Sequence, residues 1–232
     1  MKEKKRNSRI PDIILAAVMM CAIISLSVVI VLNFRPLYYM DMKTLDIPGS
    51  SGYSAGEIRE NYDALIDYNS MFFTGELEFP TLPQSEGGRI HFVEVKNIFV
   101  FFQKAALVTV ILSIAGIWLL RRERPKRYLK YAGILTLVLP LFAGAAIAVN
   151  WNRAFVLFHE LMFDNDYWLF DPVTDPVINI LPDAFFMHCA VGIVGLVVVG
   201  AGVCLAGYGI SKRRQDKVDY DMSDHAVNTY EG

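Results

Sequence analysis

The sequence lacks most of the short motifs by which soluble enzymes are recognised. It contains no P-loop, G-x-G-x-x-G, H-E-x-x-H or C-x-x-C, which excludes a nucleotide-driven transporter of the usual kind. Cysteine is scarce, and Cys21, Cys189 and Cys204 all fall in apolar segments. No disulfide framework is therefore expected in the polar loops. Internal repeats and low-complexity tracts are also absent.

The 232-residue chain carries 22 Lys and Arg and 24 Asp and Glu, but charged residues are almost absent from four long stretches. A helix rises about 1.5 Å per residue, so about 20 apolar residues cross a hydrocarbon layer of about 30 Å. Four stretches meet this requirement and no fifth does. The sequence therefore predicts an all-α membrane protein with four transmembrane helices, at 13–33, 98–120, 131–149 and 184–210.

The distribution of Lys and Arg predicts the orientation, because cytoplasmic segments carry an excess of these residues. Five basic residues lie in the first eleven positions, six in the link 121–130, and four at the start of the tail 211–232. The loop 150–183 has one basic residue against six carboxylates, and the loop 34–97 has five basic residues in 64. We therefore expect 1–12 and both termini in the cytoplasm, and the two loops outside. The basic segments favour contacts with anionic lipid, not nucleic acid.

The first outward loop predicts a small extracytoplasmic α(+β) cap, built together with the second. Ser54 and Glu57 form a capping-box pattern that opens an amphipathic helix to about Asn69. Glycines and prolines then separate two short segments, 76–79 and 89–93, that could pair as a hairpin. From about Phe92 the helical pattern runs into the second span, which places His91 at the outer end of a long helix.

The second outward loop is short and unusually apolar. Trp151, Phe155, Phe158 and Met162 follow helical spacing, and acidic residues come after them. An apolar face with acidic flanks, held between two spans, is expected to lie in the outer headgroup zone.

The candidate chemistry is a pair of histidines, one in each outward loop. His91 and His159 either have no task or act as general acid and base, because imidazole exchanges protons near neutral pH. The apolar neighbours of His159 favour its neutral form. His188, inside the fourth span, is better explained as a core histidine hydrogen-bonded to a neighbouring helix. His225 lies in the tail.

Other readings of these charges stay open. The loop carboxylates are a solvated rim or partners for Arg153, whose side chain could equally reach lipid phosphate. Two histidines with nearby acids also permit zinc, but their spacing matches no usual ligand pair.

Two blocks of sequence resemble one known family. W-N-R-A-F-V-L-F-H ending at His159, with the following residues to Phe186, and H-F-V-E-V-K-N starting at His91 resemble the lipoprotein intramolecular transacylases of Gram-positive bacteria. The stretch from Tyr62 to Asn69 fits the same family. The resemblance covers most of the chain, and it implies four spans with these loops.

The resemblance implies an acyl transfer within one substrate. A bacterial lipoprotein carries an S-diacylglyceryl group on its N-terminal cysteine, and the family moves the sn-2 acyl chain to the α-amino group of that cysteine. The product is a lyso-lipoprotein, N-acylated and S-monoacylglycerylated. The two essential histidines of the family would correspond to His91 and His159.

This reaction fits the residues, because ester and amine already share one molecule and need no enzyme nucleophile. We expect no cofactor and no metal, and as partners diacylglyceryl-modified lipoproteins and membrane lipids at the bacterial plasma membrane. The residues expected to bind substrate or support the oxyanion are Tyr62, Glu94, Asn97, Trp151, Arg153, Asn165, Trp168, Asp171 and Asp175.

Two other functions compete with the transacylase hypothesis. A non-catalytic membrane sensor or accessory protein would use its outward loops to bind a partner. A metal-dependent membrane hydrolase would lose activity with a chelator. A small-molecule transporter is less favoured, because the spans hold few polar groups and Pro140 is their single kink signal.

Overall fold

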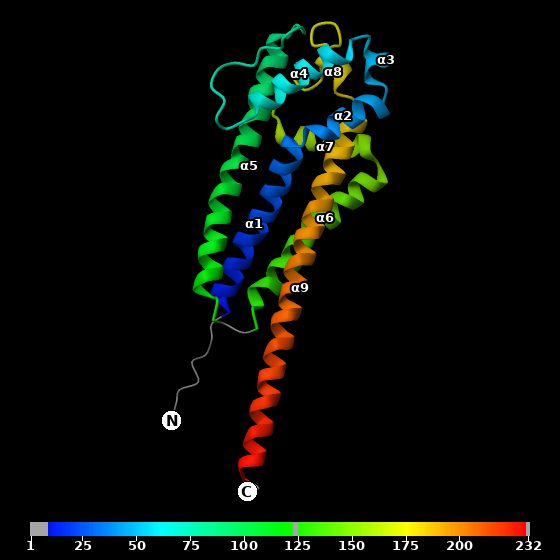
Figure 1. The fold of residues 1–232 in the computed structure, drawn as a ribbon. Coiled ribbons are helices and arrows are strands. Elements are labelled where there is room, and N and C mark those ends of the chain that lie inside the picture. Colours follow the sequence, from blue (N-terminus) through cyan, green and yellow to red (C-terminus); the bar gives the residue numbers. More distant parts are fainter. Residues whose placement is uncertain (1–8, 123–124, 231–232) are drawn as a thin grey trace.

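The computed structural model describes residues 9–122 and 125–230, in which it has nine α-helices and no strand (Figure 1). The basic residues of the first eight positions, and Arg124, lie outside this range. The side chain of His225 also lies outside the described part of the structure. The helices are α1 (Ile10–Asn33), α2 (Arg35–Thr44), α3 (Ile47–Ser51), α4 (Ala55–Tyr68), α5 (Glu86–Leu119), α6 (Arg127–Val149), α7 (Trp151–Met162), α8 (Val177–Ile180) and α9 (Asp183–Tyr230).

Four of these helices, α1, α5, α6 and α9, are long and apolar enough to cross a membrane. Each coincides with one of the four predicted apolar runs. Many of their outward side chains are large and apolar, for example Ile111 and Leu119 on α5 and Val203 on α9. Such exposure would be costly in water and suits a hydrocarbon surrounding.

Helix α1 is the centre of the long-helix layer, because it packs against α5, α6 and α9, and α6 also packs along α9. Small residues allow these close approaches. A Cβ on Gly200 of α9 would lie 2.6 Å from Ile23, and one on Gly116 of α5 would lie 2.5 Å from Leu15. At the end away from the cap, Arg127 of α6 forms an ion pair of 3.3 Å with the buried carboxylate of Asp12.

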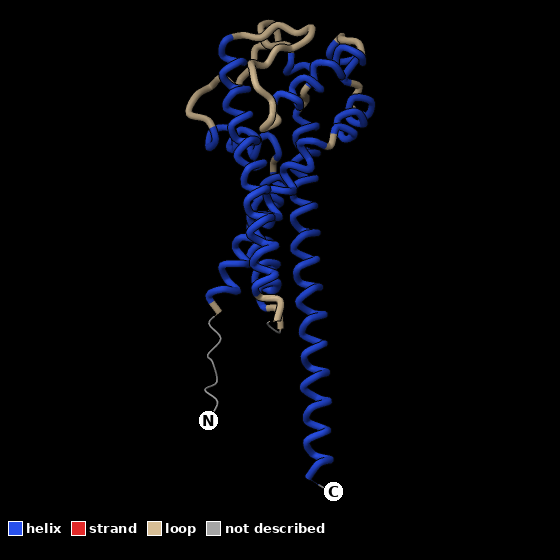
Figure 2. Tube along the Cα trace, turned by 60° about the vertical axis from the view of Figure 1, so that its left-hand side comes forward, coloured by secondary structure: helices blue, strands red, loops and turns tan. Residues whose placement is uncertain are grey.

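The short helices α2, α3, α4 and α8 form a cap at one end of the long helices, and the start of α1 and the end of α9 lie towards the other end (Figures 1 and 2). Its core is aromatic: the rings of Tyr38 and Tyr62 stack at 3.7 Å, and Phe185 of α9 meets both edge-on. The Tyr38 hydroxyl donates to the carbonyl of Ile180 at 2.7 Å, which ties α2 to α8. The cap is thus fixed to the start of α9.

The predicted capping box is confirmed, because the Ser54 hydroxyl accepts from the Glu57 amide and the Glu57 carboxylate accepts from the Ser54 amide. The predicted hairpin, and with it the β part of the cap, is wrong. Residues 89–93 belong to α5, which begins at Glu86, six residues before the predicted start at Phe92. Ser85 caps this start by accepting from the Gly88 amide at 3.0 Å.

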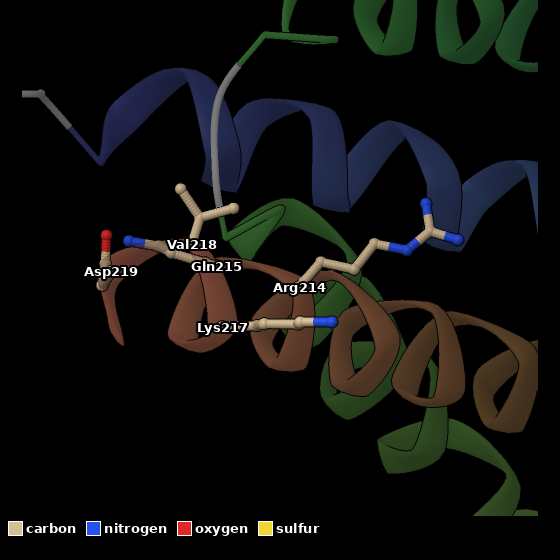
Figure 3. A pocket seen from close by; sticks show the side chains of 5 residues that line it. All are labelled: Arg214, Gln215, Lys217, Val218 and Asp219. Carbon is tan, nitrogen blue, oxygen red and sulfur yellow. The ribbon is translucent and has the colours of Figure 1, made fainter. Parts of the chain in front are cut away.

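Helix α9 continues to Tyr230, well past the predicted end of the apolar run at residue 210. At about 1.5 Å per residue its 48 residues are about 70 Å long. It therefore extends beyond the other long helices (Figure 2). A shallow hollow on this extension is lined by Arg214, Gln215, Lys217, Val218 and Asp219 (Figure 3).

Candidate functional site

The first candidate histidine, His91, lies in the second turn of α5, before the apolar run begins at residue 98. The 34 residues of α5 measure about 50 Å, so the segment before residue 98 projects beyond a hydrocarbon layer of about 30 Å. The His91 side chain is only 5% exposed. It packs against Phe163 and Phe170, whose ring centroids are 4.8 and 5.4 Å from its own.

The second candidate, His159, lies on α7, which leaves α6 through the single extended residue Asn150. The Asn150 side chain caps α7 by accepting from the Arg153 amide at 2.9 Å. The His159 ring is half-buried and lies 4.2 Å from the Phe155 ring and 4.8 Å from the Trp168 ring. Both aromatic neighbours come from the loop 150–183, which therefore supplies much of the surroundings of the His159 ring.

The two imidazole rings face each other across the site. Their centroids are 6.2 Å apart and their planes are tilted by 31°, although 67 residues separate the two positions in the chain. Phe163 contacts both rings, with centroid distances of 4.8 Å to His91 and 5.7 Å to His159. The fold therefore brings together the two histidines that the sequence assigned to separate loops.

Burial holds both imidazoles in the neutral form. Burial, with a smaller contribution from the neighbouring His159, lowers the pKa of His91 to about 4. Burial also lowers the pKa of His159, against smaller opposite effects of the Phe155 carbonyl and Asp183. A neutral imidazole has one N–H and one free lone pair, so each ring can donate a hydrogen bond and accept a proton.

The tautomer of His159 follows from a hydrogen bond inside α7. Its Nδ1 lies 2.8 Å from the carbonyl oxygen of Phe155. A carbonyl oxygen only accepts, so Nδ1 carries the hydrogen, and in the neutral ring Nε2 keeps the lone pair. His159 is thereby oriented as a proton acceptor at Nε2.

Glu94 and Asn165 join α5 to the segment after α7. The Asn165 side-chain amide donates to Oε1 of Glu94 at 2.8 Å, and the Asn165 oxygen accepts from the Tyr167 amide at 3.0 Å. Glu94 lies one turn after His91, on the same side of α5. Two predicted site residues therefore contact each other, and one of them lies a single helical turn from His91.

Of the other predicted site residues, Trp168 joins the histidine site and Trp151 lies one contact away. The Trp151 ring is 5.7 Å from the ring of Phe155, and its indole N–H is buried with no hydrogen-bond partner among the described residues. Arg153 and Asn97 are exposed. No described side-chain contact links either of these two to the histidines.

Tyr62 lies apart from the histidines, in the core of the cap against Tyr38 and Phe185. Burial raises the pKa of its hydroxyl, which therefore stays protonated. Its contacts are those of a packing residue. A role toward the ester oxyanion stays a prediction without a contact to support it.

Asp175 and Asp171 hold the second loop in place. Asp175 is 3% exposed, and its Oδ1 accepts from the Ser85 amide at 2.8 Å, just before the first turn of α5. The exposed Asp171 accepts from the Val173 amide at 2.8 Å in a turn of its own loop. These contacts orient the segment that carries Phe170, and neither carboxylate contacts a histidine ring.

Sequence analysis missed the glycine pair that lets this loop reach α5. A Cβ on Gly88 would lie 2.2 Å from Oδ1 of Asp175, and one on Gly87 would lie 3.0 Å from the Tyr167 ring. The phenylalanines that enclose His91 were also missed as site residues. The sequence signal for these phenylalanines is only that aromatic residues are frequent near the histidine motif.

His188 is hydrogen-bonded to a neighbouring helix, as predicted. Its Nδ1 lies 2.8 Å from Oδ2 of Asp41 on α2, and that carboxylate is 5% exposed. The pair ties the cap to α9 and stands apart from the two-histidine site. Among the described residues, no three His, Cys, Asp or Glu side chains are grouped so as to hold a metal ion.

Comparison with known proteins agrees with this architecture. A protein of Aquifex aeolicus (strain VF5), described as uncharacterized, is 36% identical over 96 residues, which are 41% of this chain and 43% of that protein. The chain thus matches less than half the length of that relative.

Solved structures match over a much longer range. The membrane integral lipoprotein intramolecular transacylase Lit from Bacillus cereus is 37% identical and superimposes with a TM-score of 0.87, over 90% of this chain and 97% of that one. Two variants of it, with one histidine replaced by arginine or by alanine, are 37% and 38% identical. Both superimpose with a TM-score of 0.80, over 90% of this chain and 94% and 95% of theirs.

The family profile described as lipoprotein intramolecular transacylase Lit matches residues 13–186. This range contains most of α1, all of α2 to α8, the start of α9 and both site histidines. With its four apolar helices and its two-histidine site, the chain belongs to the Lit family of membrane-integral lipoprotein transacylases.

Proposed function

We propose that this protein transfers the sn-2 acyl chain of an S-diacylglyceryl cysteine to the α-amino group of the same cysteine. The observation that carries the proposal is the pair of neutral imidazoles 6.2 Å apart in an aromatic enclosure. The reaction needs a group that takes a proton from the amine and then returns one to the glycerol oxygen, and a neutral imidazole that becomes imidazolium between the two steps does both.

The bond changes balance without any further reactant. The amine nitrogen attacks the ester carbonyl, a new N–C bond forms, and the C–O bond to glycerol breaks. One proton leaves the nitrogen and one reaches the glycerol oxygen. We assign the first transfer to Nε2 of His159, because its Nδ1 hydrogen is committed to the Phe155 carbonyl. The protonated His159 then gives this proton to the glycerol oxygen, and the neutral His91 donates a hydrogen bond toward the ester oxygens.

The reaction belongs at the outer face of the bacterial plasma membrane, with both termini in the cytoplasm. The excess of Lys and Arg at the opposite end supports this orientation. Helix α7 also presents exposed apolar side chains, among them Val156, Leu157, Phe158 and Leu161. Such a face is suited to the headgroup zone, where the acyl chains of the substrate begin.

Mass spectrometry of a reporter lipoprotein, produced together with this protein, tests the proposal. We expect an N-acylated, S-monoacylglycerylated N-terminus, with little conversion by His91→Ala or His159→Ala at equal membrane levels. Glu160→Ala is the matched control, because Glu160 is exposed and follows His159 on α7. A free N-terminus with intact diacylglycerol refutes the proposal. If the histidine substitutions left the lipid product unchanged, a non-catalytic binding protein would be favoured. If a chelator abolished activity, a metal-dependent hydrolase would be favoured.

A further inference from the structure

The carboxylate of Glu94 is only half satisfied. Oε1 accepts the hydrogen bond from Asn165, but Oε2 is shielded from solvent and has no partner among the described residues. The Nδ1 atom of His91, one turn away on α5, is also buried without a partner. Two unsatisfied polar atoms therefore occur close together along the same face of one helix.

An unpaired carboxylate oxygen in such a place is unusual, because buried polar atoms in folded proteins nearly always have a partner. The nearby basic side chains are engaged elsewhere. Lys96 donates to the Phe73 carbonyl at 3.1 Å and lies over the Tyr68 ring, and Arg89 pairs with Glu76 and Glu86. In the described part of the chain no ion pair reaches Glu94, so its Oε2 is open to a donor from a bound molecule.

The substrate has a group of the required chemistry. An α-amino group has a pKa near 8, so most of it is ammonium at neutral pH, with three N–H donors and a positive charge. We propose that Glu94 binds the α-ammonium group of the lipoprotein's N-terminal cysteine, held in place by Asn165. This inference rests on the proposed transacylase function and adds the group that recognises the free N-terminus.

The position also serves the chemistry. Binding at Glu94 brings the nitrogen beside the two-histidine site, where the ammonium loses one proton before attack. That first proton passes to water. As the lone pair forms the N–C bond, the second proton of the nitrogen passes to His159, and the protonated His159 gives it to the glycerol oxygen as the C–O bond breaks. Glu94 acts before these steps, by selecting substrates whose amine is still free.

Access to Glu94 requires a movement of the second outward loop. The aromatic rings of Phe163 and Phe170 close over His91, and Asn165 bridges the loop to Glu94. Helix α7 has no buried residue, so its displacement exposes little packed core. Entry of the substrate is expected to separate this segment from α5 and to open the carboxylate.

A binding experiment with two probes tests the inference in detergent micelles. The probes are a fluorescent S-diacylglyceryl lipopeptide with a free N-terminus and the same lipopeptide with an acetylated N-terminus. The protein carries His159→Ala, so that turnover does not consume the first probe. We expect the free amine to bind at least tenfold more tightly than the acetylated form, and Glu94→Gln to abolish this preference.

Two further variants make the result specific. Glu94→Asp keeps the negative charge and is expected to retain part of the preference. Asp166→Asn removes an exposed carboxylate of the same loop and is expected to retain all of it. Equal affinity for both probes with Glu94 intact, or an unchanged preference in Glu94→Gln, overturns the inference.

The proposed function is judged separately, from conversion of the free-amine lipopeptide by the protein with both histidines. Absence of conversion contradicts the transacylase proposal. Conversion together with a missing Glu94-dependent preference contradicts only the ammonium site.

Discussion

The contact between Gly88 and Asp175 leads to a quantitative prediction for Gly88→Ala. The added Cβ would lie 2.2 Å from Oδ1 of Asp175 and 3.3 Å from the Phe170 ring. The carboxylate would have to leave the Ser85 amide, to which it is bound at 2.8 Å. A buried hydrogen bond to a charged group contributes about 1.5–3 kcal/mol, and overpacking costs about 1–3 kcal/mol more. Alanine is favoured over glycine in a helix by about 1 kcal/mol, so the net loss of folding stability should be about 2–5 kcal/mol.

The measurement is the apparent melting temperature in detergent, followed by labelling of the buried Cys204 as the protein unfolds. A loss of this size corresponds to a shift of roughly 5–15 °C for a chain of this length. Gly202→Ala on α9 is the matched control, because a Cβ there meets nothing within 4 Å. Equal melting temperatures for the two variants would refute the reasoning. Conversion of the reporter lipoprotein should also fall for Gly88→Ala, because the displaced Phe170 packs against His91.

Three further predictions concern stability. As the pH falls from about 6.5 to about 4, the unfolded state binds a proton at His91 and the folded state does not. The free energy of unfolding should therefore fall by about 2 kcal/mol at pH 5. Melting curves of His91→Gln should lack this part of the pH dependence, and an unchanged pH dependence in that variant contradicts the prediction. Asp41→Ala leaves His188 without its hydrogen-bond acceptor and should destabilise the protein by about 1–3 kcal/mol. The rate of acyl transfer per folded molecule, measured by mass spectrometry, should stay within about twofold of that of the unaltered protein. A large loss of this rate would mean that Asp41 and His188 take part in the reaction. Ser54→Ala removes half of the capping box and should cost about 1 kcal/mol in the same melting assay, whereas a Tm equal to that of the unaltered protein would show that α4 needs no cap.

The features predicted well from the sequence depend on short stretches of chain. A run of about 20 apolar residues is sufficient to indicate a spanning helix, whatever its neighbours are. The capping box likewise needs only Ser54 and Glu57, three residues apart. The helical pattern of α7 was visible for the same reason.

The features predicted badly depend on contacts between distant segments. Gly87 and Gly88 indicated a turn, because glycine is usual there, and so suggested a hairpin. In the structure they lie in the first turn of α5, where the missing side chains leave room for Tyr167 and Asp175. Nothing within ten residues of these glycines indicates that partner. The same limit applies to the candidate site, since the pairing of His91 with His159 depends on how α7 folds back.

The construction of the site suggests why so little of α7 is buried. The histidines need a dry surrounding to stay neutral, and aromatic rings provide it without competing hydrogen bonds. Under the proposed function a lipid-anchored substrate must nevertheless reach both rings, which a permanently packed enclosure would prevent. Here α5 supplies a firm base that bears His91, and α7 brings His159 on an element with no buried residue of its own. The enclosure can therefore open by moving α7 while the long helices stay in place, and closing it restores both the low dielectric and the 6.2 Å separation of the rings.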